Sequence, residues 1–155
     1  MDQKNETQPD QQTIEEILNL YKSGKLNKAK KKIENCIKKF PKSFVLFNIL
    51  GGVYAGQDEL EVAINHHKKS VEINPDYAEG YNNLGIAFQK LGLFEEAVKN
   101  FKKTLKLKPN FSLAYNNLGV ALKSLNKLDE ALVTSKKAVE LNPKFADAHN
   151  NIGAI

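Results

Sequence analysis

Histidine and cysteine are the side chains of this sequence best suited to metal binding or nucleophilic catalysis. The chain has one cysteine, Cys36, and three histidines, His66, His67 and His149. Neighbouring helical residues point about 100° apart, so His66 and His67 cannot face one metal ion. Nothing near Cys36 in the sequence predicts an activated thiolate. We therefore expect packed side chains at these positions, with no catalytic site, no bound metal and no cofactor.

Asparagine pairs are the stronger candidates for a binding function. Asn83, Asn117 and Asn151 recur at intervals of 34 residues, and each is preceded by a second asparagine, at Asn82, Asn116 and Asn150. A primary amide offers donors and an acceptor, which match the groups of a peptide main chain. A column of amides would hold an extended peptide whatever its side chains. The alternative is that the amides bridge adjacent helices and stabilise packing, and both roles are compatible.

The 34-residue period also predicts the elements that carry these side chains. Apolar residues recur at helical spacing twice within each period, which indicates two amphipathic helices. Residues suited to the left-handed conformation fall between the two helices, and a proline ends the second helix. The turn residues are Gly24, Asp58, Gly92 and Asn126, and the prolines are Pro41, Pro75, Pro109 and Pro143. Asp58 and Glu61 also offer a capping box for the helix that follows them.

These patterns predict an all-α fold, a right-handed α-solenoid of four helical hairpins and a partial fifth. The expected repeats cover residues 10–43, 44–77, 78–111, 112–145 and, in part, 146–155. We expect residues 10–155 to form one cooperative domain. Residues 1–9 are polar and without periodicity, which predicts a disordered tail.

The repeat resembles the tetratricopeptide repeat. The matching residues in the best-matched repeat are Tyr81, Leu84-Gly85, Phe88, Ala97, Phe101 and Pro109, and the likeness is specific for residues 44–155. It is looser for residues 10–43, where Thr13 stands at the aromatic position. The resemblance implies a scaffold that binds a protein or peptide partner in a concave groove lined by the first helices.

The asparagine column is similar to the asparagine ladder in the repeat domain of O-linked N-acetylglucosamine transferase, whose repeats also read Asn-Asn-Leu-Gly. By that resemblance Asn83, Asn117 and Asn151 bind a peptide main chain. In the second repeat the equivalent position is Ile49, with Val45 and Gly52 nearby. We therefore expect the groove to be apolar in its N-terminal half and lined with amides in its C-terminal half.

A carboxylate clamp is not expected. Co-chaperones of this family that grip a C-terminal carboxylate use Lys, Asn and Arg at fixed positions of their first helices. The position after the core Leu-Gly holds Gly52, Ile86, Val120 and Ala154, and the chain contains no arginine.

Charge and hydropathy argue against two further classes of protein, those that bind nucleic acid and those that associate with membranes. The net charge is +5, but all 23 basic residues are lysine, whereas arginine is the better side chain for bidentate phosphate and base contacts. We therefore do not expect nucleic-acid binding. The first residues have no apolar run, and the most apolar stretch is shorter than the roughly 20 residues of a membrane span. We expect no membrane association and a cytoplasmic location.

The fifth repeat has one incomplete helix, which predicts a piece of a longer protein and end-to-end self-association through an uncovered apolar edge. The expected function is a non-catalytic interaction scaffold. The alternative is the substrate-recruiting module of a larger enzyme, similar to glycosyltransferases or sulfotransferases with repeat domains.

Overall fold

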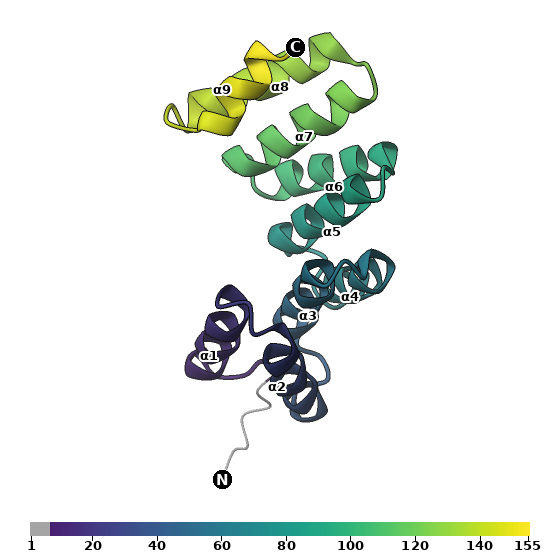
Figure 1. The fold of residues 1–155 in the computed structure, drawn as a ribbon, viewed down its shortest axis with the longest axis vertical. Helices are drawn as coiled ribbons and strands as arrows, with labels where there is room; N and C mark the ends of the chain where they lie inside the picture. Colours follow the sequence, from purple (N-terminus) through teal and green to yellow (C-terminus); the bar gives the residue numbers. More distant parts are fainter. Residues whose placement is uncertain (1–6) are drawn as a thin grey trace. The chain divides into compact units, whose positions relative to one another are not determined.

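All regular secondary structure is helical in the computed structural model, which describes residues 7–155. This range contains nine α-helices and no strand, and Figure 1 shows consecutive helices folded back on each other as hairpins. The helices are α1 (Gln11–Lys22), α2 (Leu26–Lys39), α3 (Phe44–Gly56), α4 (Leu60–Ile73), α5 (Ala78–Lys90), α6 (Phe94–Leu107), α7 (Ser112–Ser124), α8 (Leu128–Leu141) and α9 (Ala146–Gly153). The prediction of an all-α fold of repeated hairpins is confirmed for this part of the chain.

Left-handed residues turn the chain inside each of the four hairpins. Their φ angles are +70° at Gly24, +64° at Asp58, +76° at Gly92 and +58° at Asn126. Glycine adopts this conformation without steric cost, and Asp and Asn tolerate it better than other side chains. In the second hairpin the N–H of Glu59 donates to the Tyr54 carbonyl at 2.9 Å, which closes the end of α3.

The expected capping box at Asp58 and Glu61 is wrong. Glu59 is the N-cap residue of α4, and no side chain there bonds to the first turn. Asp58 instead occupies the left-handed position before the cap, too far back to accept from the helix. Side-chain caps do start two other helices: Asp10 accepts from the Thr13 N–H at 2.7 Å, and Ser43 accepts from the Leu46 N–H at 3.3 Å.

The chain divides into two compact units, Met1–Pro75 and Asp76–Ile155. The first unit contains α1 to α4, and its helices α1, α2 and α3 share a core that includes fully buried Ile17, Ile33 and Leu46. The second contains α5 to α9, with Phe101 as its largest fully buried side chain. Gly85 permits this packing, because a Cβ atom there would lie 2.6 Å from the Phe101 ring.

The predicted N-terminal tail is described only in part. Residues 1–6 lie outside the described residues. At the end of the predicted tail, Gln8 accepts a hydrogen bond from the Ser43 hydroxyl at 2.5 Å, and Pro9 is buried. Among the described helices, none is long and apolar enough to cross a membrane.

Candidate peptide-binding site

The asparagine pairs of the second unit lie on the first helices of its hairpins, α5, α7 and α9, and form side-chain bridges. The Asn117 amide donates to the Asn82 side-chain oxygen at 3.3 Å, and the Asn151 amide donates to that of Asn116 at 2.8 Å. The amide that precedes the core leucine in one repeat therefore binds the first asparagine of the repeat before it.

The two members of each pair differ in exposure. Asn82 and Asn116 are only 3% and 6% exposed, while Asn83, Asn117 and Asn151 keep part of their surface in solvent. Asn150 is exposed. The buried Asn82 and Asn116 thus orient the half-exposed Asn117 and Asn151. The bridge uses one N–H of Asn117, and the side-chain oxygen of Asn117 accepts no hydrogen bond from residues 7–155.

The three apolar residues predicted for the groove lie in the first unit, on α3. Ile49 is 9% exposed and belongs to the hydrophobic core shared with Ile17 and Ile33. Val45 packs against the same core and remains half-exposed. At Gly52 a Cβ atom would lie 3.5 Å from the Tyr21 hydroxyl. Ile49 therefore keeps little surface to offer a ligand, because its side chain packs into the core that α3 shares with α1 and α2.

His67 is packed in the interior of the α3–α4 hairpin. Its ring is 2% exposed and lies over Gly51, and its Nδ1 is 3.0 Å from the Asn48 side-chain oxygen. Burial, with a smaller contribution from neighbouring His66, lowers the pKa of His67 to about 4. The ring is therefore neutral at physiological pH.

The remaining histidines and the cysteine each have surroundings of their own. The His66 ring stacks on Tyr54, with ring centroids 5.1 Å apart, and burial lowers its pKa. His149 is exposed, with Nε2 2.9 Å from the Pro143 carbonyl oxygen. Cys36 is half-buried. Between residues 7 and 155, no three His, Cys, Asp or Glu side chains are placed to hold a metal ion together.

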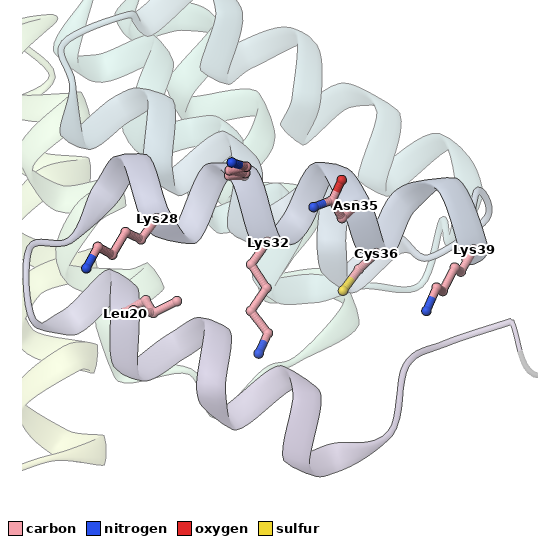
Figure 2. A pocket seen from close by; sticks show the side chains of 7 residues that line it. Leu20, Lys28, Lys32, Asn35, Cys36 and Lys39 are labelled. Atoms are coloured by element: carbon pink, nitrogen blue, oxygen red, sulfur yellow. The ribbon is translucent and has the colours of Figure 1, made fainter.

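A cleft between α1 and α2 was not predicted from the sequence. Figure 2 shows Lys32 and Cys36 extending from α2 toward α1, where Leu20 lies opposite them. The 34-residue register contained a signal for it, because Thr13, Leu20 and Lys32 stand where the next repeat has Phe47, Tyr54 and His66.

Comparison with solved structures supports the fold assignment. A crystal structure of MamA superimposes with a TM-score of 0.80 at 24% identity, covering 88% of this chain and 80% of MamA. A second MamA structure gives a TM-score of 0.75 at 28% identity, and the match covers 86% of this chain and 73% of that MamA chain. The first TPR of Spaghetti (RPAP3), bound to HSP90 peptide SRMEEVD, gives a TM-score of 0.71 at 24% identity. The match covers 72% of this chain and 89% of that domain.

Family models identify the repeats directly. No curated protein sequence matches significantly. A model described as tetratricopeptide repeat matches residues 78–111 and 112–145, and a TPR repeat model matches residues 51–92. Together these matches span residues 51–145, more than half of the chain. The chain therefore belongs to the tetratricopeptide repeat family.

Proposed function

We propose that this chain is a protein-interaction scaffold without catalytic activity, and that the half-exposed asparagines Asn83, Asn117 and Asn151 hold the main chain of an extended peptide. The observation that carries the proposal is the bridge from Asn117 to Asn82. A buried amide fixes the orientation of a half-exposed one and leaves its oxygen able to accept from a peptide N–H.

Orientation matters because binding otherwise costs the rotamer freedom of each side chain that becomes ordered. An ordered rotamer-rich side chain costs about 0.5–1.5 kcal/mol on binding, and prior orientation removes part of this cost. The bridge between α5 and α7 and the bridge between α7 and α9 therefore serve packing and binding together. The two roles that the sequence left open do not compete for the same atoms, since the bridge uses an N–H and the peptide uses the oxygen.

Two similarities support the class of ligand. The first TPR of Spaghetti (RPAP3) is a structural neighbour that binds a peptide, which favours peptide binding by this fold. The Asn-Asn-Leu-Gly phrases at Asn82 and Asn116 are similar to those of the O-linked N-acetylglucosamine transferase repeats. Without arginine, the chain lacks one component of a carboxylate clamp, so we propose recognition of the peptide main chain instead of its terminus.

The test compares peptides that differ only in their main chain. Several end-blocked, unstructured peptides of unrelated sequence are titrated against the protein by fluorescence anisotropy, each beside a copy with N-methylated main-chain amides. We expect the unmodified peptides to bind with similar affinity and the N-methylated copies to bind much more weakly. Binding that depends on side chains and ignores N-methylation would refute main-chain recognition.

Substitution then locates the site. The double variant Asn83→Ala/Asn117→Ala should bind the peptides about 30-fold more weakly, because two hydrogen bonds are lost and each is worth roughly 1 kcal/mol. Asn65→Ala, at an exposed position of α4, is the control and should bind normally. Unchanged peptide affinity in the double variant, together with a loss of unfolding free energy, would show that the column serves packing alone.

A further inference from the structure

The α1–α2 hairpin carries an open cleft that belongs to the first unit, whereas the asparagine column belongs to the second. Its volume is about 450 Å³, within the range of about 300–1,000 Å³ common for ligand pockets. Leu20 of α1 and Cys36 of α2 contribute apolar surface, and four lysines of α2 line the cleft. Figure 2 labels Lys28, Lys32 and Lys39 on this helix. The lining residues are Leu20, Lys28, Lys31, Lys32, Asn35, Cys36 and Lys39.

The equivalent groove of the second hairpin is filled by aromatic rings. The His66 ring of α4 stacks on Tyr54 of α3 with centroids 5.1 Å apart, and lies 6.2 Å from the Phe47 ring. The ammonium of Lys30 covers this stack, 4.3 Å from the centre of the Tyr54 ring. Three rings and one cation thus close the space between α3 and α4.

The first hairpin has the same groove without the rings. Thirty-four residues earlier, Phe47, Tyr54 and His66 are replaced by Thr13, Leu20 and Lys32. A threonine, a leucine and a lysine cannot build a stack, so the space between α1 and α2 stays open. A ring supplied by a partner would find this space open, with Leu20 and Cys36 as apolar surface to pack against.

The charge around the cleft selects the partner. Helix α2 has the sequence LNKAKKKIENCIKK, with six lysines and one glutamate. Lys28, Lys31 and Lys39 are exposed and form no ion pair within 4.0 Å among the described residues. Lys32 alone is paired, with Glu16 of α1. Positive charge is therefore available along about 16 Å of helix between Lys28 and Lys39, the length of about five extended residues.

We propose that this cleft binds an acidic peptide segment through one aromatic side chain. The ring enters between Leu20 and Cys36, and the flanking carboxylates pair with Lys28, Lys31 and Lys39. A lysine ammonium over the ring adds a cation–π contact of the kind that Lys30 makes with Tyr54. An aromatic anchor in a desolvated pocket, surrounded by ion pairs, is the usual form of a tight contact in protein interfaces. A peptide fits better than nucleic acid because the cleft offers one anchoring pocket and no arginine.

The test uses a fluorescein-labelled, Glu-rich peptide with one central Phe, and a matched peptide with Ser in place of that Phe. Leu20→Tyr supplies the ring that the second hairpin has at Tyr54, so it should fill the cleft without changing charge. We expect Leu20→Tyr to weaken binding of the Phe peptide about tenfold and to leave the weaker Ser peptide unaffected. Equal binding of the two peptides to the unsubstituted protein would overturn the aromatic anchor, as would unchanged binding of the Phe peptide to Leu20→Tyr.

Charge variants test the lysines. Lys28→Gln/Lys31→Gln/Lys39→Gln should reduce affinity for the Phe peptide about tenfold, since exposed ion pairs contribute little singly but add when several act on one ligand. The control Lys99→Gln/Lys102→Gln/Lys106→Gln removes the same charge from exposed positions of α6 and should bind normally. An equal loss of affinity in both triple variants would show that only the overall charge of the protein matters, which would overturn the role of these three lysines. An oligothymidylate of matched charge that competes as well as the Phe peptide would favour nucleic acid and reject the proposal.

Discussion

His67 links the packing of a single residue to the pH dependence of stability. Its pKa is about 4 in the folded chain, because the buried ring would have to carry a charge away from water. In the unfolded chain the pKa is about 6.5. Between these two pH values the unfolded chain binds a proton that the folded chain does not. The free energy of unfolding therefore falls as pH is lowered from 6.5 to 4, by up to about 3 kcal/mol.

Urea unfolding at a series of pH values measures this loss, and a substitution isolates its source. Phe101 occupies the position of His67 in the next repeat and lies over Gly85 as His67 lies over Gly51. His67→Phe should therefore fold and should remove most of the decline between pH 6.5 and 4. His66→Gln, at a half-exposed neighbour, should retain most of the decline. Identical pH profiles for His67→Phe and the unsubstituted chain would contradict this assignment.

At the scale of the helices, the turns set the geometry of every hairpin. Gly92→Ala should lower the free energy of unfolding by about 1–2 kcal/mol, because φ at Gly92 is +76° and a Cβ is disfavoured there. Asp58→Gly should raise the free energy of unfolding by a few tenths of a kcal/mol or more. The φ angle of Asp58 is +64°, and glycine adopts this conformation without the strain that a Cβ causes. Gly153→Ala is the control: it ends α9, its φ is not positive, and no atom would lie within 4 Å of the new Cβ. Thermal unfolding followed by circular dichroism ranks the stabilities of the three variants. Equal destabilisation by Gly92→Ala and Gly153→Ala would refute the argument from the φ angle.

The helices and turns were predictable because the same types of residue pack in the same places of each repeat. The spacing of Gly24 and Gly92 placed the turns, and Pro41 lies two residues after the end of α2, as the pattern requires. The site was less predictable. The sequence showed a pair of asparagines in three of the repeats but not that Asn82 would be buried and bonded to Asn117, since this depends on side-chain rotamers.

The cleft of the first hairpin was missed for a different reason. Its lining has Leu20 and Lys32 where the next repeat has the rings of Tyr54 and His66, and a missing ring leaves no chemically active residue in the sequence to mark the site. Comparing each position with its counterpart 34 residues later is the step that reveals it. The same comparison placed Ile49 on α3 but did not reveal that its side chain is buried, with little surface left to line a groove.

At the scale of the whole molecule, the question is whether residues 10–155 unfold together. The periodic sequence predicts one cooperative domain, whereas the contacts divide the chain into compact units at Pro75 and Asp76. In repeat proteins, stability is approximately a sum of repeat and nearest-neighbour contributions, so a local loss is felt most strongly nearby. Leu118→Ala truncates a side chain of α7 that is 5% exposed and should cost about 2–5 kcal/mol.

Native-state hydrogen exchange of Leu118→Ala distinguishes the two descriptions. We expect amides of α5 to α8 to exchange faster by the full amount of the destabilisation, while those of α1 to α4 change little, because the two units open separately. The reciprocal variant Leu46→Ala, at a fully buried position of α3, should accelerate exchange in α1 to α4 and spare α5 to α8. If either variant accelerates exchange equally in both units, the chain unfolds as one domain, as the sequence period predicts. Separate opening would allow the cleft of the first unit and the asparagine column of the second to engage partners independently.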